Sequence, residues 1–294
     1  MNLREFVCLG KLPAPHRLRV LVYSWRKLFG LTRTARQTEA NRLLRFLASA
    51  SAVVTGSNQD RILMNVRLFM STVVVQARSY PSSDLGILYQ VLGKEEYSPV
   101  VDLAKKLRMS GALRILDAGA NVGYATLYFH AAFPQATIAA LEIDQNNALQ
   151  IRKHLESNGL TTVQLWENAL WSRNANLRIR RDFRDQTECS FYVEETLEAP
   201  EVIGRSLREI CDQMQWTAVD ILKIDIEGGE RYLFETDELA DELLRSTRIL
   251  AIEIHDEFQI RQSVLRHLTR NGFSHLDHGD LTIAYKPLDE TNDI

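Results

Sequence analysis

From Arg114 onward, short apolar runs alternate with amphipathic stretches at the spacing of strands and helices. This alternation predicts a doubly wound, mostly parallel Rossmann-like α/β sheet with helices on both faces. The apolar run Ile138-Ala-Ala-Leu suits a strand that is covered on both sides. The predicted parallel strands are Arg114–Ala118, Thr137–Ile143, Thr162–Leu165, Val219–Ile226 and Arg248–Ile254.

Two hairpins are predicted beside these parallel strands. Phe273–Asp277 and Leu281–Lys286 flank the compact turn His278-Gly279-Asp280, so the C-terminus should add an antiparallel hairpin at one edge. Residues 172–203 are less regular, and Asn176–Arg181 with Ser190–Val193 predict a small hairpin inserted after the third strand. The sheet should therefore carry one insertion and end on a hairpin.

The N-terminal part of the chain lacks this alternation of strands and helices. Residues 1–77 are predicted to form a basic, mainly helical N-terminal extension, and 78–294 the main domain. Leu43, Leu44, Phe46 and Leu47 would share the apolar face of a helix. Ser51 to Asp60 is polar and predicts a loop, whereas Arg61 to Ala77 is apolar and should end in a strand.

Charge is unevenly distributed along the 294 residues, although the chain as a whole carries only −3. The first 50 residues hold ten basic side chains and two acids, a net of +8, which leaves −11 for the rest. An acidic main domain argues against binding to the phosphates of nucleic acids. With 45% hydrophobic and 25% charged residues, the composition is that of a globular protein.

The sequence shows no clear membrane-spanning or signal segment and no disulfide pattern. No run of about 18 apolar residues predicts a membrane-spanning helix, and no signal peptide is evident. Cys8, Cys189 and Cys211 are widely spaced and odd in number, which is typical of reduced cysteines and predicts a cytoplasmic protein.

The stretch Arg17 to Leu31 mixes large apolar side chains with basic ones. It could lie on an anionic membrane surface as an amphipathic helix. The favoured interpretation is an ordinary helix packed on the core or on a second subunit, as in a homo-oligomer. Both interpretations stay open at the level of the sequence.

The motif Asp117-Ala-Gly-Ala-Asn-Val-Gly123 follows an apolar strand and precedes a helix. Gly119 allows a sharp turn, Gly123 allows close approach to a ligand, and the helix start offers free N–H groups. The spacing is not that of the G-x-G-x-x-G dinucleotide fingerprint. Glu142 ends the next strand, where an acid can accept hydrogen bonds from both hydroxyls of a ribose.

Two further strand ends carry charge. Lys223, Asp225 and Glu227 alternate out of one strand, so they share a face, and three charges on a buried strand are costly unless paired or functional. Glu253 and His255 leave the following strand in the same way, and a histidine there is a candidate general base. At the carboxyl ends of parallel strands these side chains would line the ligand crevice.

Together these motifs resemble the FkbM-type SAM-dependent methyltransferases. The matching strings are Asp117-Ala-Gly-Ala-Asn-Val-Gly-Tyr124, Glu142, Asn168-Ala-Leu170, Leu222-Lys-Ile-Asp-Ile-Glu-Gly-Gly-Glu230 and Ile252-Glu-Ile-His255. The resemblance covers about residues 78–287 and implies a seven-stranded sheet with S-adenosyl-L-methionine (SAM) in the crevice.

The resemblance and the residues together give a set of expected roles. Cofactor binding is expected from Asp117, Gly119, Asn121, Gly123, Glu142, Asn168, Ala169 and Asp225. Asp225 and His255 are the candidate bases, with Lys223 beside them, and Glu227, Glu230 and Glu253 are expected to position the acceptor. A divalent metal on Asp225, Glu227 or Glu253 is conceivable but not required.

The predicted activity is O-methylation of a hydroxyl on a sugar, glycan or natural product, with no nucleic-acid partner. Two alternatives remain. An NAD-dependent Rossmann enzyme lacks support because its glycine fingerprint is missing. A non-catalytic SAM-binding or interaction protein would not need three charges on one face of a strand.

Overall fold

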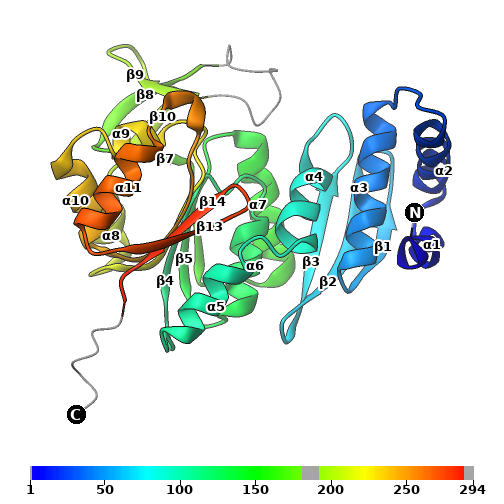
Figure 1. Cartoon of the computed structure of the whole chain (residues 1–294), viewed down its shortest axis with the longest axis horizontal. Coiled ribbons are helices and arrows are strands. Elements are labelled where there is room, and N and C mark those ends of the chain that lie inside the picture. Colours follow the sequence, from blue (N-terminus) through cyan, green and yellow to red (C-terminus); the bar gives the residue numbers. More distant parts are fainter. Residues whose placement is uncertain (1, 181–191, 288–294) are drawn as a thin grey trace.

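The computed structural model describes residues 2–180 and 192–287, and its centre is a seven-stranded sheet (Figure 1). The strands lie in the order β13-β14-β12-β11-β4-β5-β6. Their bounds in that order are Ser274–His278, Leu281–Tyr285, Thr247–Glu253, Val219–Ile224, Arg114–Ala118, Thr137–Leu141 and Val163–Trp166. Pairings among β12, β11, β4, β5 and β6 are parallel, and β14 runs antiparallel to both of its neighbours. The predicted mostly parallel sheet with a C-terminal hairpin is confirmed.

Helices cover both faces of this sheet because alternate strand residues face opposite sides. Ile115 belongs to one buried cluster and its neighbour Leu116 to another. The first cluster includes residues of α5, α6 and α7, and the second includes residues of α8, α10 and α11. These helices span Ser98–Lys106, Tyr124–Ala132, Gln145–Asn158, Leu207–Met214, Asp237–Arg245 and Arg261–Arg270.

A four-stranded sheet interrupts the repeat after β6, in the order β7-β10-β8-β9. The four strands span Asn168–Leu170, Val202–Arg205, Ala175–Arg180 and Tyr192–Glu195. Antiparallel pairing of β8 with β9 confirms the inserted hairpin. The parts of that prediction at Arg181 and Ser190, and the position of Cys189, lie outside the described residues.

The N-terminal region contains helices α1, α2 and α3 and then a three-stranded antiparallel sheet, β1-β2-β3. The elements span Leu3–Leu9, Ala14–Leu28, Ala35–Ser49, Ala52–Ser57, Arg61–Leu68 and Ser71–Arg78. The predicted helices are confirmed, but the predicted loop at Ser51–Asp60 was wrong because β1 occupies most of it. Half of the residues in that strand are exposed, and the strand is held by pairing with β2, which a local polar pattern does not reveal.

The small sheet packs against the large one through α6 and α7, and both share one buried cluster. Met64 and Val75 belong to the same cluster as Phe129 and Ile138. The division at residue 77 therefore stays a prediction. Short helices complete the fold: α4 (Asp84–Leu88), the π-helix η1 (Tyr89–Gly93), α9 (Glu230–Leu233) and the 3-10 helix η2 (Asp256–Phe258).

Candidate active site

The strand order reverses between β4 and β11, because β5 and β6 continue to one side of β4 while β11 and β12 lie on the other. Open α/β sheets bind ligands outside the carboxyl ends of the strands at such a point. Here β4, β5, β11 and β12 deliver Asp117, Glu142, Asp225 and Glu253 to one region. The predicted clustering of charged strand ends is present in the structure.

The loop between β4 and α6 passes very close to the chain that follows β11. A Cβ atom on Gly119 would lie 1.8 Å from the carbonyl oxygen of Asp225, and Gly119 has a φ of +78°. The amides of Gly119 and Ala120 both donate to the carbonyl of Leu141. Gly123 then precedes the first turn of α6 in the left-handed conformation. The glycines of the motif are thus required by the backbone itself.

A buried ion pair supports this loop from below. Lys223 Nζ lies 3.1 Å from Asp117 Oδ1 and donates to the carbonyl oxygen of Gly119 at 2.6 Å. Thr126 Oγ1 donates to the other Asp117 oxygen at 2.6 Å. Burial lowers the pKa of Lys223, but the carboxylates of Asp117 and Asp225 outweigh it and raise that pKa. Lys223 is therefore a protonated positioning residue rather than a proton-transfer group. Asp117 holds Lys223 in place and so supports the loop indirectly.

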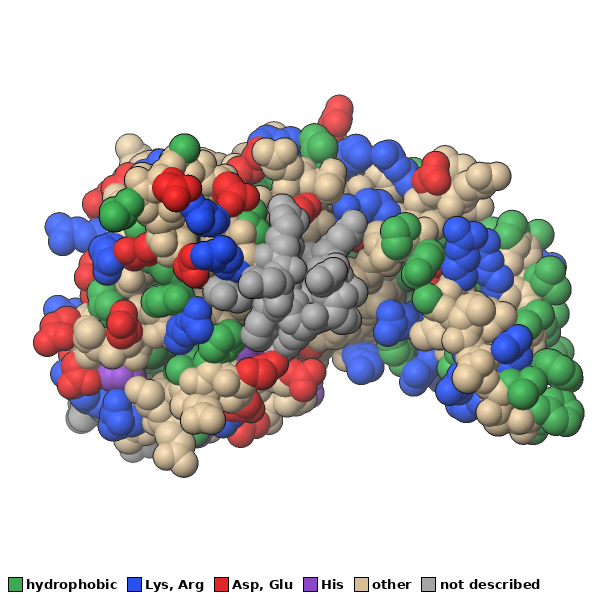
Figure 2. All heavy atoms as spheres, turned by 90° about the horizontal axis from the view of Figure 1, so that it is seen from above, with side chains coloured by type: hydrophobic (Ala, Val, Ile, Leu, Met, Phe, Trp, Pro, Cys, Tyr) green, Lys and Arg blue, Asp and Glu red, His purple; other side chains and the backbone are tan. Residues whose placement is uncertain are grey.

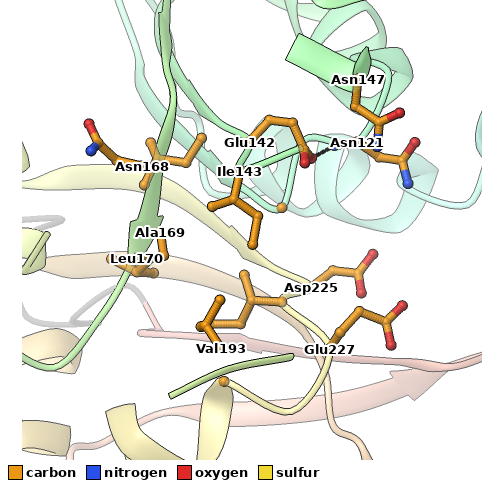
Figure 3. A pocket seen from close by; sticks show the side chains of 14 residues that line it. Asn121, Glu142, Ile143, Asn147, Asn168, Ala169, Leu170, Val193, Asp225 and Glu227 are labelled. Atoms are coloured by element: carbon orange, nitrogen blue, oxygen red, sulfur yellow. Dashed lines mark hydrogen bonds between the residues drawn. The ribbon is translucent and has the colours of Figure 1, made fainter. Parts of the chain in front are cut away.

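A cleft with about 680 Å³ of empty space, open solvent included, lies between this loop, the end of β5, the inserted sheet and the segment after β11 (Figure 3). It is the first of two cavities at this end of the sheet. Its polar lining includes Asn121, Glu142 and Asn147 on one side, with Asp225 and Glu227 opposite. Apolar lining comes from Leu141, Ile143, Leu170, Val193 and Ile226. Mostly apolar walls with a few convergent polar groups are typical of a small-molecule site.

Glu142 is the best-placed acid in this cavity. One carboxylate oxygen accepts from the amide of Asn121 and the other from that of Asp144, each at 2.7 Å. Burial raises the pKa of Glu142 to about 7, although both amides act to lower it. Each oxygen keeps a lone pair for a hydroxyl group, so the fixed carboxylate fits the expected ribose contact.

Asn168 and Ala169 line the same cavity from β7, and their binding of the cofactor stays a prediction. The Asn168 carboxamide points away from the cavity in Figure 3 and donates to the carbonyl oxygen of Ile203 on β10. Its polar group is thus used to fix the inserted sheet. Sequence reasoning missed Ile143, Asn147 and Val193. Only Ile143 had a local signal, because it directly follows Glu142.

A second cavity of about 790 Å³ adjoins the first and shares Gly119, Asn121, Asp225 and Glu227 with it. It extends under η1 and the following residues, which supply Gln90, Glu96 and Tyr97. Carboxylates dominate its charged lining: Glu96, Asp225, Glu227, Glu253 and Asp280. Lys223 is the one basic side chain among the described residues that line it, and Asp117 already neutralises that charge.

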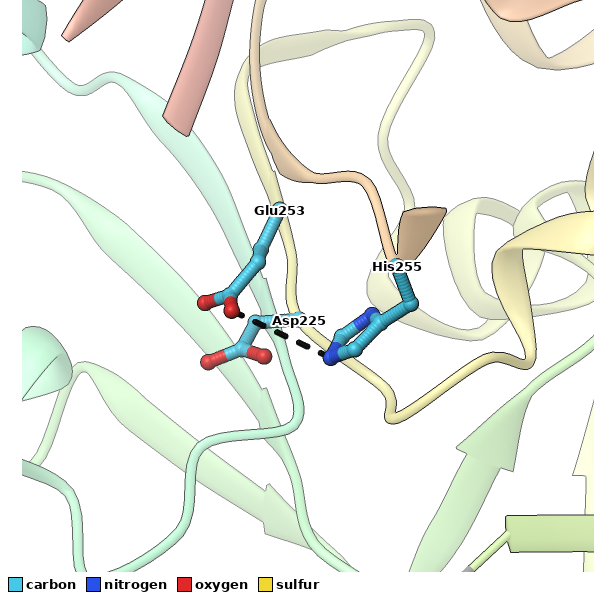
Figure 4. Close-up of side chains that lie close together, drawn as sticks. All are labelled: Asp225, Glu253 and His255. Atoms are coloured by element: carbon cyan, nitrogen blue, oxygen red, sulfur yellow. Dashed lines mark ion pairs between the residues drawn. The ribbon is translucent and has the colours of Figure 1, made fainter. Parts of the chain in front are cut away.

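Figure 4 shows Asp225, Glu253 and His255 with their polar ends converging. His255 Nε2 lies 3.4 Å from Glu227 and 3.9 Å from Glu253, while Nδ1 lies 3.1 Å from Glu230. Glu230 is completely buried and also accepts from the amide of Ile226. Glu230 therefore holds His255 in place, and its predicted contact with the acceptor stays a prediction.

The predicted role of His255 as a general base is not supported by this environment. Burial lowers the pKa of His255, but its contacts with Glu227 and Glu230 outweigh burial and raise it to about 10. A histidine that is already protonated at neutral pH cannot accept a proton. Burial raises the pKa of Asp225 and raises that of Glu253 to about 8, with Asp225 adding to the latter effect. Of the two candidate bases, Asp225 therefore remains.

Asp225, Glu253 and His255 could also hold a divalent cation. One ligand atom from each lies within 4.8 Å of the others, and two carboxylates with an imidazole form a plausible donor set. A cation would have to displace the proton that Glu227 and Glu230 hold on His255, so metal binding would compete with the existing ion pairs.

The fold and the residues at the strand ends define a class, the SAM-dependent methyltransferases. The profile described as "Methyltransferase FkbM domain" matches residues 117–275, more than half of the chain. The chain therefore belongs to the FkbM methyltransferase family.

Comparisons with individual proteins give only distant similarity. No curated protein matches the sequence. Among solved structures, a precorrin-6y C5,15-methyltransferase from Geobacter metallireducens is 14% identical, with a TM-score of 0.39 over 67% of this chain and 88% of that one. A putative O-methyltransferase from Klebsiella pneumoniae is 16% identical, with a TM-score of 0.36 over 64% and 79%.

Proposed function

We propose that this methyltransferase transfers the methyl group of SAM to a hydroxyl of a neutral sugar, glycan or natural product. The observation that carries the proposal is the pair of adjoining cavities that share Gly119, Asn121, Asp225 and Glu227. The first cavity combines apolar walls with Glu142 and suits a nucleoside. The second is acidic and suits an acceptor rich in hydroxyl groups, because carboxylates accept several hydrogen bonds at once.

The residues present fit SAM, which supplies an electrophilic methyl group when bound. Glu142 would hold the ribose, the backbone of Gly119 and Asn121 would face the methionine part, and Asp225 lies where the two cavities meet. The surrounding carboxylates would favour a cationic sulfonium. An acidic lining with no free basic side chain among the described residues offers no partner to a phosphorylated or carboxylated acceptor, so we expect the acceptor to be uncharged.

In this proposal Asp225 would accept the proton of the acceptor hydroxyl, while SAM would supply the methyl group and leave as a neutral thioether. Lys223, at 3.8 Å, and the protonated His255 favour the ionised form of Asp225. Glu227 and Glu253 would orient the acceptor. Much of the rate enhancement would come from holding the hydroxyl in line with the methyl group.

The experiment combines titration calorimetry with SAM and a transfer assay with isotope-labelled SAM and a panel of glycosides. We expect Asp225→Asn to keep its fold while transfer falls by about 10²–10⁴-fold. Glu235→Gln, which changes an exposed acid that lines neither cavity, is the matched control. Full transfer by a folded Asp225→Asn variant would reject the base assignment.

Two further outcomes test the rest of the proposal. If SAM does not bind, the function itself is wrong, and if SAM binds but no acceptor is modified, the non-catalytic alternative gains support. Since the mechanism needs no metal, activity should survive EDTA. Loss in EDTA and recovery with Mn²⁺ would instead assign Asp225, Glu253 and His255 to a cation.

A further inference from the structure

The N-terminal helices carry an apolar face that the rest of the described chain does not cover. On α2, side chains Leu18, Leu21, Trp25, Leu28 and Phe29 are 46% to 79% exposed. On α1, Leu3, Phe6 and Val7 are 63% to 80% exposed. Monomeric soluble proteins rarely expose so many large apolar groups in one region, and such a patch marks an interaction site.

The pattern on α2 is that of an amphipathic helix turned outward. Leu18, Leu21, Trp25 and Leu28 recur every three or four residues and so share one side. Val20 and His16 lie on the opposite side and are buried, as expected for the side that packs on α3. One side of α2 thus packs against the rest of the protein, while its other, more apolar side is exposed to solvent.

Basic side chains border this apolar side. At about 100° per residue, Arg17 falls at one border and Arg26 at the other. Arg4, Lys11 and Lys27 are further exposed cations of the two helices and their connection. Figure 2 shows hydrophobic side chains with Lys and Arg between them at the end of the molecule that these helices occupy. Glu5 and Glu39 are the acids among residues 1–50, and Glu39 is buried.

We propose that α1 and α2 dock the protein on an anionic lipid surface, with Trp25 and its neighbours in the interfacial region. An apolar face bordered by Lys and Arg, with aromatic side chains on it, has the composition of interfacial helices. The net charge of this region favours a lipid surface over a second copy of the chain. A symmetric dimer would bring two N-terminal regions together, each with a net charge of +8 over residues 1–50. An anionic bilayer supplies both the apolar phase and the opposite charge.

The mode of attachment would be peripheral. Within residues 2–180 and 192–287 no helix is long and apolar enough to cross a bilayer. Since α2 packs on α3, which shares a buried cluster with the large sheet, the docked helix would be rigidly connected to the methyltransferase part. The inference does not depend on the identity of the methyl acceptor.

The test is co-sedimentation of the full chain with vesicles of phosphatidylcholine alone or with about 30% phosphatidylserine. We expect binding only to the anionic vesicles. The double variant Leu21→Glu/Trp25→Glu should lose it, because both side chains lie on the apolar side of α2 and about half of each is exposed. Leu149→Ser, which alters an exposed leucine on α7, is the matched control and should bind as the wild type does.

The charge contribution is tested separately with Arg4→Gln/Lys11→Gln/Lys27→Gln. Each removed charge should weaken partitioning by about fivefold. Insertion is tested by quenching of tryptophan fluorescence with brominated lipid, because Trp25 is the most exposed of the four tryptophans. Trp25→Phe should remove the quenching while binding persists.

Two results would overturn the proposal. One is wild-type protein that stays in the supernatant with anionic vesicles, or a Leu21→Glu/Trp25→Glu variant that still sediments with them. The other is a wild-type dimer in analytical ultracentrifugation that this double variant dissociates, without vesicle binding. That result would assign the face to a second copy.

Discussion

Lys223 and Asp117 form a fully buried ion pair beneath the glycine loop, with Nζ 3.1 Å from Oδ1. The same ammonium group donates to the carbonyl oxygen of Gly119, so one charge pair fixes the loop that separates the two cavities. Asp225 lies farther from Lys223, at 3.8 Å, which leaves its carboxylate facing the cavities.

Replacing Lys223 by Met should be strongly destabilising, because the Asp117 carboxylate would be left buried without an opposite charge. We expect the free energy of unfolding to fall by about 3–5 kcal/mol in a urea titration. Adding Asp117→Asn should recover part of the loss, since the amide keeps an acceptor for Thr126. Additive losses in the double variant would show that the pair is not coupled.

Two glycines with similar backbone angles should respond very differently to a methyl group. Gly111 has a φ of +85° and no atom within 4 Å of a Cβ, whereas a Cβ on Gly119 would meet backbone 1.8 Å away. Gly111→Ala should cost about 1 kcal/mol of stability and leave SAM affinity unchanged. Gly119→Ala should abolish SAM binding in calorimetry, and equal behaviour of the two variants would contradict the steric explanation.

SAM affinity should depend on pH through Glu142. Burial raises the pKa of Glu142 to about 7, and only the ionised carboxylate accepts with both oxygens. Affinity should therefore decrease as the pH is lowered through 7. Glu142→Gln should bind about 10–100-fold more weakly and lose most of this dependence, because a charged hydrogen bond contributes about 1.5–3 kcal/mol. A wild-type affinity that stays constant from pH 6 to 8 would be the contrary result.

The pH profile of kcat/KM should reflect carboxylates rather than His255. The pKa of Glu253 is raised to about 8 by burial and by Asp225, whereas that of His255 is raised to about 10. We expect the rate to increase with pH as Asp225 ionises, at a pH above the usual range of an aspartate because burial raises the pKa of Asp225. Glu253→Gln should shift the increase to lower pH, because Asp225 loses a negative neighbour and ionises more easily. An unshifted profile would show that the ionisation of Asp225 does not depend on the charge of Glu253.

Glu39, buried in α3, should make the fold less stable at high pH. Burial raises its pKa to about 7 from a usual 4.5, so its protonated form favours the folded state. The destabilisation should appear as the pH rises from about 4.5 to 7 and then stay constant. Glu39→Gln should raise the free energy of unfolding at pH 8 by about 2 kcal/mol, with no gain at pH 4. A gain of the same size at both pH values would point to packing instead.

Much of the fold could be predicted because its signals are local. The five parallel strands and the C-terminal hairpin follow from apolar runs and turn residues, each readable within about ten positions. The strand at Ala52–Ser57 was missed because it has one fully buried side chain, Ala52, and depends on pairing with β2. Val193 was missed because the inserted sheet brings it to a cavity whose other walls are far away in the sequence.

The sequence by itself determined which chemical groups end the strands: Asp117, Glu142, Asp225, Glu253 and His255. Only the tertiary structure decided what each group can do. Lys223 is paired with a residue more than a hundred positions away, and His255 is held protonated by acids from another strand-to-helix segment. Protonation depends on burial and on charges a few ångströms away, and those distances are set by packing rather than by neighbours along the chain.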